Sequence, residues 1–293
     1  MNSDLIKLKY NSKSLVKTYL VCLLLVLSFG IYKNIFNLID QGVSYAFLLS
    51  KLLYVIIPVM IGLFFDSFSK KKINFGYNSL IGLIVGMIVP FNMNWIVYII
   101  SLIPMILLGF LDKKNKLNRI CIIKLIGVSI LLIIGKYNYL NILESSYEYA
   151  YSLVDVFVGN QVGGIFSTSV LLILVSLLLL SFNKIYKVKI AIFSLITYIL
   201  ILSLLLFTKD YMNIFMMMLN SSNIFAFVFI APFSMYSPYK NKLVIIYSIV
   251  IGVLSALLTY FVTPYEGAII SILFANIFML LLEKFHISTN KLK

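Results

Sequence analysis

Two glycines followed by three hydroxyl side chains are the residues most suited to bind a ligand. Gly163-Gly164 interrupts a long apolar stretch, and Ser167, Thr168 and Ser169 follow it. Glycine lets a ligand approach the backbone closely, and free N–H groups at the start of a following helix favour an anion such as a phosphate. The segment therefore predicts a contact for a cofactor phosphate or for a second ligand. The competing interpretation is a helix N-cap made by Ser167 or Thr168.

Three further polar residues lie in or beside apolar stretches, where such residues are costly and usually functional. Lys51 lies deep in one stretch, and its candidate partners are Asp40 and Glu266. A structural ion pair and a contact with a ligand or ion are both open for Lys51. Glu266 opens the last apolar segment, where a carboxylate complements the helix dipole. Asn276 follows in the same segment as a candidate to bind a polar ligand or to satisfy broken backbone.

A short pattern occurs twice: an Asn-Ser pair, an apolar piece, and a proline 12 residues after the asparagine. Its members are Asn78, Ser79 and Pro90 in the first copy, and Asn220, Ser221 and Pro232 in the second. Each apolar piece is shorter than the ~20 residues that span a bilayer. Short, proline-ended segments at matching positions of two halves indicate a central ligand or ion pathway built by an inverted repeat. The alternative is coincidence in a sequence rich in Ile, Leu and Asn.

The composition identifies the class of protein that carries these residues. Of the 293 residues, 62% are hydrophobic and 12% are charged, whereas soluble domains are about half apolar and about a quarter charged. Long apolar runs recur from end to end, which predicts an all-α polytopic membrane protein without a soluble catalytic domain. The single histidine, His286, lies in the C-terminal tail, and Cys22 and Cys121 lie in apolar runs. We therefore expect neither a metal site nor a catalytic residue.

Positive charge predicts how the chain crosses the membrane. Lys and Arg residues gather in alternate gaps between apolar segments, so both termini are expected in the cytoplasm. This placement explains the net charge of +14 without nucleic acid. An acidic gap at 138–155 is expected outside and divides the chain into a first five-helix repeat at 1–137 and a second at 156–293. The ten predicted segments are roughly 15–36, 42–65, 77–92, 94–111, 120–137, 150–183, 188–207, 211–235, 243–262 and 267–283.

Three stretches, in the same order and at similar spacing, resemble the RnfD/NqrB family, the large membrane subunits of ion-translocating, flavin-containing electron-transport complexes. The stretches are 78–95, 162–169 and 229–276, which look like the family segments SALLTGLLLALTLPP…PWW, PGSxGETS, and ATDxVTSP with YPEGxxxAILLMN. The resemblance implies ten helices in two inverted five-helix repeats, similar to urea and ammonium channels, in a bacterial cell membrane. It also implies other membrane subunits as partners, with a flavoprotein or a quinone as further candidates.

The sequence departs from this family at the flavin site. Family members of this type usually carry Ser-Gly-Ala-Thr with FMN esterified to the threonine, and that tetrapeptide is absent here. Ser167 replaces the glutamate of GETS, and Phe233 replaces the aspartate of ATD. We therefore expect FMN or riboflavin to be bound noncovalently or supplied by a partner, and we expect no covalent FMN-threonine.

The leading functional hypothesis is a membrane subunit of an Rnf/Nqr-like complex that helps flavin-mediated electron transfer across the membrane, with coupled movement of Na⁺ or H⁺. Any redox chemistry would belong to the cofactor, because the chain has no catalytic side chains of its own. One alternative is a channel or transporter for a small polar solute on the same fold. The other is a scaffold that holds redox partners together without a cofactor.

Overall fold

The computed structural model describes residues 2–36, 39, 42, 44–68, 75–90, 93–111, 152–161, 163–207, 211–233, 237–238, 241–262 and 265–290. Across these ranges the chain forms helices joined by turns and no strand, with one isolated β-bridge. This confirms the prediction of an all-α membrane protein. The predicted membrane segment at 120–137 lies outside the described residues, as do most of the predicted linker at 138–155, Asp40 and Cys121.

Within the described ranges, four helices are long and apolar enough to cross a membrane. They are α1 (Asn2–Ile31) with the π-helical turn η1 (Tyr32–Phe36) that continues it, α3 (Tyr45–Phe68), α9 (Val188–Leu205) and α12 (Asn241–Phe261). Many Leu, Ile, Val and Phe side chains on their surfaces are exposed, which suits contact with lipid rather than with water. Four such helices support a chain that spans the membrane several times, and the number of ten spans stays a prediction.

The remaining helices include several that are too short to cross the membrane. The full set of remaining helices in the described ranges is α4 (Tyr77–Ile88), α5 (Trp95–Leu111), α7 (Leu153–Val158), α8 (Val170–Ser181), α10 (Tyr211–Met218), α11 (Ser221–Phe225) with the π-helical η3 (Ala226–Ile230) that continues it, and α13 (Gly267–Asn290). The 12 residues of α4 and of α8 extend about 18 Å at 1.5 Å per residue, well below the ~30 Å of the hydrocarbon core.

The two Asn-to-Pro pieces are short helices that end two residues before their proline. We call them the first segment (77–90, containing α4) and the second segment (220–232, containing α11 and η3). Proline lacks an N–H and pushes the preceding residue out of the helical region. Val89 accordingly has an extended backbone with ψ of 137° and ends α4.

Glycines bring α4 against α3. A Cβ atom at Gly86 would lie 2.6 Å from the carbonyl oxygen of Tyr54, and a Cβ at Gly82 would overlap the carbonyl of Pro58. Small residues four apart on one helix face let two backbones approach closely, which is a common way for membrane helices to associate. The first segment is therefore held to α3 by close backbone packing.

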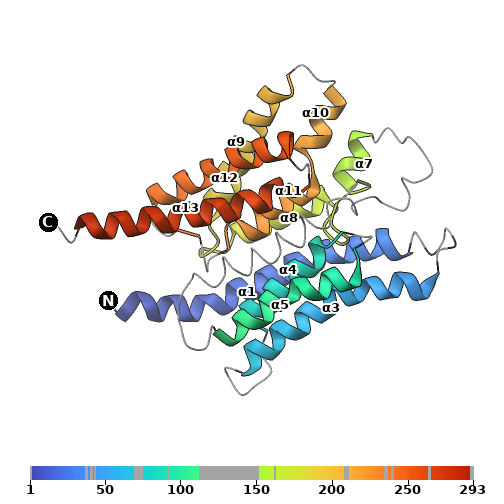
Figure 1. Cartoon of the computed structure of the whole chain (residues 1–293), viewed down its shortest axis with the longest axis horizontal. Coiled ribbons are helices and arrows are strands. Elements are labelled where there is room, and N and C mark those ends of the chain that lie inside the picture. The colour runs from blue at the N-terminus through green and yellow to red at the C-terminus, as the bar shows by residue number, and fades with distance from the viewer. Residues whose placement is uncertain are drawn as a thin grey trace.

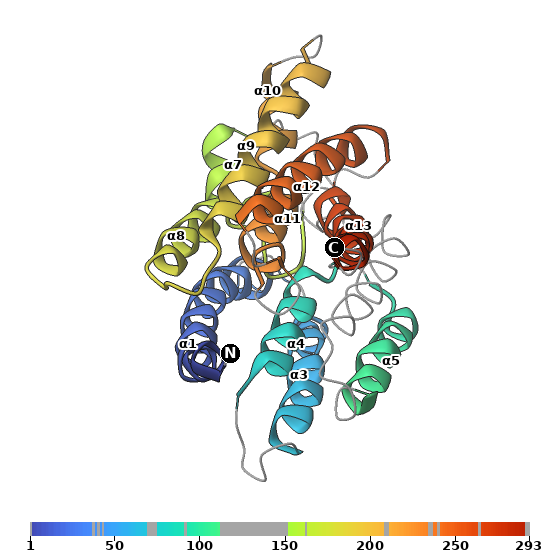
Figure 2. The same cartoon turned by 90° about the vertical axis from the view of Figure 1, so that its left-hand side faces the viewer.

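The helices of the two halves of the chain form two groups. α1, α3, α4 and α5 lie together in the lower part of Figure 1, and α9 to α13 lie in the upper part. α8 packs against α1 and joins the groups, and α12 packs against both α9 and α13, as Figure 2 shows from the end that holds the termini. Both termini lie at this same end (Figure 1), as an even number of spans requires. The division into inverted repeats stays a prediction.

Candidate functional site

The two segments run antiparallel beside each other. The ring of Tyr77, at the start of the first segment, lies 5.6 Å from the ring of Phe233, just past the end of the second. At the opposite ends, Gly164 forms a β-bridge with Pro90 and donates its N–H to the hydroxyl of Ser222 at 3.4 Å. The start of each segment therefore lies near the end of the other.

A buried turn, residues 163–169, lies where the first segment ends and the second begins. We call it the glycine turn. Its Ile165 N–H donates to the carbonyl of Val89 at 2.7 Å, and its Phe166 N–H donates to that of Met87 at 3.1 Å. A helix leaves its last carbonyls without intrahelical partners, so the glycine turn supplies donors to the end of α4.

Protein atoms fill the space beside both glycines. A Cβ at Gly164 would lie 2.7 Å from Cα of Ile88, and a Cβ at Gly163 would lie 2.7 Å from Oγ of Ser221. Both distances are too short for a real Cβ atom, so a side chain at Gly164 would displace the backbone of α4, and one at Gly163 would displace the Ser221 hydroxyl. The glycines therefore allow a close approach to their backbone, as the sequence predicts, but the atoms that approach belong to the two segments and not to a ligand.

Three buried hydroxyl groups gather around these glycines. Ser167, Thr168 and Ser221 are at most 2% exposed, and their hydroxyls have no hydrogen-bond partner among the described residues. Ser167 Oγ lies 2.5 Å from the Cβ position of Gly164, and the Cβ position of Gly163 lies 2.7 Å from Oγ of Ser221 and 3.6 Å from the methyl carbon Cγ2 of Thr168. Leaving a buried polar group unsatisfied costs about 1–3 kcal/mol, and such groups commonly mark water, ion or ligand contacts. We call these three groups the hydroxyl cluster.

Helix capping leaves the hydroxyl cluster available. The N-cap of α8 is Ser169, whose Oγ accepts from the Leu172 N–H at 3.4 Å, and not Ser167 or Thr168. The N-cap of α11 is Asn220, whose Oδ1 accepts from the Ser222 N–H at 3.0 Å. Two helix N-termini, which carry partial positive charge, thus begin beside the hydroxyl cluster.

Two residues that sequence reasoning missed hold the chain just before the glycine turn. The buried ammonium of Lys33 donates to the carbonyls of Gly159 at 2.7 Å and Gln161 at 2.8 Å. The side-chain amide of Gln161 donates to the carbonyls of Thr168 at 3.3 Å and Leu219 at 3.2 Å. The sequence feature that could have identified Lys33 is its position near the end of the first apolar segment, beside a gap that is poor in Lys and Arg.

Asn78 and Ser79 lie at the other end of the first segment, away from the glycine turn. The carboxylate of Asp66 accepts from the Ser79 hydroxyl at 2.6 Å, the Ser79 N–H at 2.8 Å and the Asn78 side-chain amide at 3.1 Å. It also accepts from the N–H of Gly76 at 2.9 Å. Sequence reasoning missed Asp66, which is an isolated carboxylate 12 residues before Asn78. These bonds give Asn78 and Ser79 a structural role at the start of α4.

Pro232 lies near this same end, at the finish of the second segment. Its carbonyl accepts from the Ser237 hydroxyl at 3.4 Å. The ammonium of Lys187 donates to the carbonyl of Ser237 at 2.7 Å and to its hydroxyl oxygen at 2.8 Å. A positive charge near the C-terminus of a helix is favourable. The ammonium of Lys187 thus lies near the end of the second segment, and the carboxylate of Asp66 binds the start of the first.

The other predicted pathway residues, Lys51, Glu266 and Asn276, are all buried. Lys51 is buried, with its ammonium 4.4 Å from the centroid of the Phe47 ring, a favourable cation–π geometry. Glu266 is fully buried just before α13. On α13, Asn276 accepts from the hydroxyl of Tyr247 at 3.2 Å. The pairing of Lys51 with Glu266 or Asp40 stays a prediction.

Asn223, on α11, joins four helices. Its side-chain amide donates to the hydroxyls of Tyr198 on α9 and Thr259 on α12, both at 3.2 Å. Its carbonyl oxygen accepts from the N–H of Ala268 at the start of α13 at 3.0 Å. These bonds hold the second segment within the upper group of helices.

A profile of the NQR2, RnfD, RnfE family matches residues 124–291, more than half of the chain. The chain is a member of this family. The matched region contains the glycine turn, the second segment and two of the three resembling stretches, whereas the stretch at 78–95 lies outside it. No curated protein matches the chain. Family membership makes the chain a membrane-embedded subunit of a multi-subunit complex of the Rnf/Nqr type.

Flavin is the cofactor that this family implies. The space beside the glycine turn shows which part of a flavin could bind there. Beside Gly163 and Gly164 there is no room for a methyl group, so an isoalloxazine ring does not fit there. The hydroxyl cluster offers three donors that suit a few polar atoms, such as phosphate oxygens, water or a small ion. Noncovalent binding of a flavin through such a contact stays a prediction, and the sequence has no threonine in the Ser-Gly-Ala-Thr context for a covalent bond.

Proposed function

We propose that the chain helps flavin-mediated electron transfer across the membrane as a subunit of an Rnf/Nqr-type complex, and that it provides a path for coupled Na⁺ or H⁺. The flavin, bound noncovalently or held by a partner subunit, would supply the electron-transfer chemistry. The proposal is supported by family membership together with the hydroxyl cluster at the junction of the two segments.

The hydroxyl cluster is the observation that carries the ion path. Broken helices at membrane depth are tolerated where they are buried in protein or line a cavity. A hydroxyl both donates and accepts hydrogen bonds, so three of them pass a proton between water molecules or replace part of the water shell of Na⁺. The cluster lies where the two antiparallel segments meet, which is the position expected for a central site in an inverted repeat.

The test uses the intact complex reconstituted in proteoliposomes. Thr168→Val and Ser221→Ala remove cluster hydroxyls, and Ser176→Ala is the matched control because its buried hydroxyl already donates to the Leu172 carbonyl at 2.7 Å. We expect donor-driven uptake of labelled Na⁺, or donor-driven proton movement, to fall about tenfold in the cluster variants, with electron transfer retained. Ion movement equal to that of Ser176→Ala would overturn the ion path.

The visible spectrum tests the flavin part. Flavin bands that leave the purified protein on acid denaturation support a noncovalent cofactor, and a colourless subunit in a flavin-containing complex supports a flavin held by a partner. Bands that remain on the precipitated chain would contradict the absence of a covalent site. A complex without flavin would overturn the redox role. Solute uptake by the subunit alone would then favour a channel, which the two short segments also support as transporter architecture.

A further inference from the structure

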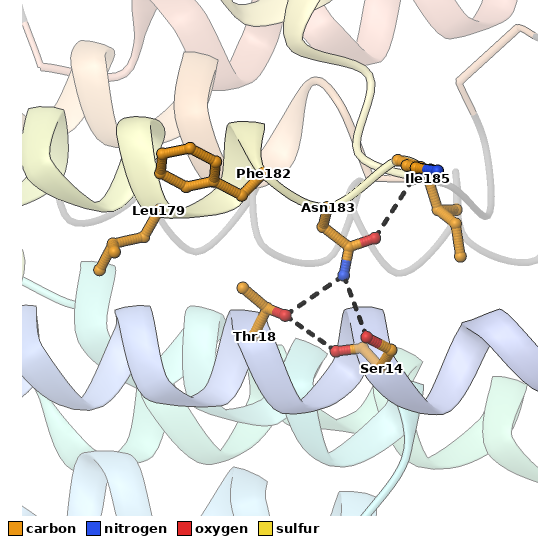
Figure 3. Close-up of a pocket in the computed structure, with 7 residues that line it drawn as sticks. Ser14, Thr18, Leu179, Phe182, Asn183 and Ile185 are labelled. Atoms are coloured by element: carbon orange, nitrogen blue, oxygen red, sulfur yellow. Dashed lines mark hydrogen bonds between the residues drawn. The ribbon is translucent and has the colours of Figure 1, made fainter.

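A polar pocket opens between α1 and the end of α8, far from the glycine turn. Its volume is about 320 Å³, and its lining residues are Ser14, Thr18, Leu179, Phe182, Asn183, Lys184 and Ile185 (Figure 3). α1 belongs to the first half of the chain and α8 to the second. A ligand in this pocket therefore touches both halves.

The pocket is organised by Asn183. Its side-chain amide donates to the hydroxyl oxygens of Thr18 at 3.2 Å and Ser14 at 3.5 Å, and its carbonyl oxygen accepts from the Ile185 N–H at 3.2 Å (Figure 3). Ser14 accepts in this network, so its hydroxyl proton is available to a ligand. Lys184 adds an exposed ammonium to the lining. The pocket thus offers donors and positive charge, and its lining contains no acidic residue.

The surroundings of the pocket combine further positive charge with apolar surface. Lys13 and Lys17 are exposed on α1, next to the lining residues. Phe182 is 84% exposed at the rim. From the pocket, exposed apolar side chains continue along both helices, on α1 as Val21, Leu24 and Leu25, and on α8 as Leu178, Val175 and Leu171. A ligand that complements this surface carries a negative head and apolar tails.

We propose that the pocket binds the headgroup of an anionic phospholipid, with the acyl chains lying along the exposed faces of α1 and α8. The phosphate accepts from Ser14 and pairs with Lys184, and Lys13 and Lys17 add attraction. The positive-inside pattern places this end of the molecule at the cytoplasmic leaflet, where anionic lipids supply such headgroups. The bound lipid then fastens the first half of the chain to the second.

The test titrates the delipidated full chain in detergent with phosphatidylglycerol, phosphatidylcholine or inorganic phosphate, and follows bound lipid by native mass spectrometry and the thermal unfolding midpoint. Lys184→Gln removes a pocket charge, and Ser14→Leu fills the pocket at an exposed helix position. Lys189→Gln is the matched control, because Lys189 is an exposed lysine at the start of α9 and lies outside the lining.

We expect one tightly held phosphatidylglycerol that raises the unfolding midpoint. Its affinity should fall about fivefold in Lys184→Gln, fall further in Ser14→Leu, and stay unchanged in Lys189→Gln. Equal binding of phosphatidylcholine would overturn the recognition of a negative headgroup. Binding of inorganic phosphate with the same stabilisation would overturn a lipid in favour of a soluble anion. Equal losses in Lys184→Gln and Lys189→Gln would overturn the pocket. Unfolding midpoints measured without added lipid show whether each variant is folded.

Discussion

The two Asn-to-Pro segments share a sequence pattern and a length, yet the protein stabilises them by different means. The first segment starts on the carboxylate of Asp66, which another helix supplies, and packs against α3 through Gly82 and Gly86. The second segment starts on its own asparagine, Asn220, and its π-helical part is wholly buried. The comparison teaches that a repeated sequence pattern sets where a short helix begins and ends, whereas the neighbouring helices decide what holds it.

The start of the first segment gives the largest expected effect. Asp66→Ala removes the acceptor for three backbone N–H groups, a hydroxyl and a side-chain amide, and we expect a loss of about 3 kcal/mol in the free energy of unfolding. Chemical denaturation in detergent micelles measures it. Asp155→Ala is the matched control, because Asp155 accepts in a capping box at the exposed start of α7, and its loss should be much smaller. Equal losses would contradict the role assigned to Asp66.

The glycine packing of the first segment comes next. Gly82→Val places a branched side chain against the backbone of Pro58, and we expect a loss of about 2 kcal/mol in the free energy of unfolding. Gly82→Ala should lose less, because it adds a single carbon. An unchanged unfolding midpoint in Gly82→Val would show that α3 and α4 are not in close backbone contact.

The start of the second segment depends on a weaker cap. Asn220→Ala removes the acceptor for the N–H groups of Ser222 and Asn223, and we expect a loss of about 1 kcal/mol. Asn220→Asp should restore most of it, because aspartate caps helices as well as asparagine does. A loss in Asn220→Ala as large as that in Asp66→Ala would remove the contrast between the two segments.

The hydroxyl cluster predicts a change of opposite sign. Thr168→Val replaces a buried hydroxyl that has no partner among the described residues by a methyl group of similar size. We expect a gain of about 1 kcal/mol in the free energy of unfolding, together with the loss of ion movement described above. Ser176→Ala, which removes a hydrogen-bonded hydroxyl, should not stabilise the protein. Destabilisation by Thr168→Val would indicate that this hydroxyl is satisfied within the protein.

The end of the second segment gives an effect that depends on pH. Burial lowers the pKa of Lys187 to about 8 from its ordinary value of 10.5. Between these two values the unfolded chain holds the proton and the folded chain has released it, so Lys187 makes the free energy of unfolding rise with pH over this window. Lys187→Met should lack this rise. Coincident pH profiles for the wild type and the variant would contradict the lowered pKa.

Local sequence patterns were sufficient to predict the class of fold and the end of α4. Apolar runs without charge can only be satisfied in lipid as helices, because every backbone group needs an internal partner. Proline disfavours a helical conformation at the residue before it and lacks an N–H of its own, although Pro58 stands within α3. The end of α4 before Pro90 follows this rule, because Val89 has an extended backbone, whereas Ala231 before Pro232 keeps helical backbone angles.

Packing between distant parts of the chain determines which residues meet. This packing brings the glycine turn, Ser221 and Pro90 to one place and leaves Asn78 and Ser79 at the opposite end of α4. It also adds Asp66 and Lys33, which no sequence pattern predicted as site residues. It also decided that Ser169 caps α8 while the hydroxyls of Ser167 and Thr168 stay uncommitted. Capping and burial depend on the position of a neighbouring backbone within about 3 Å. Hydropathy and charge patterns do not give the position of a neighbouring backbone with that precision, because packing between distant parts of the chain sets that position.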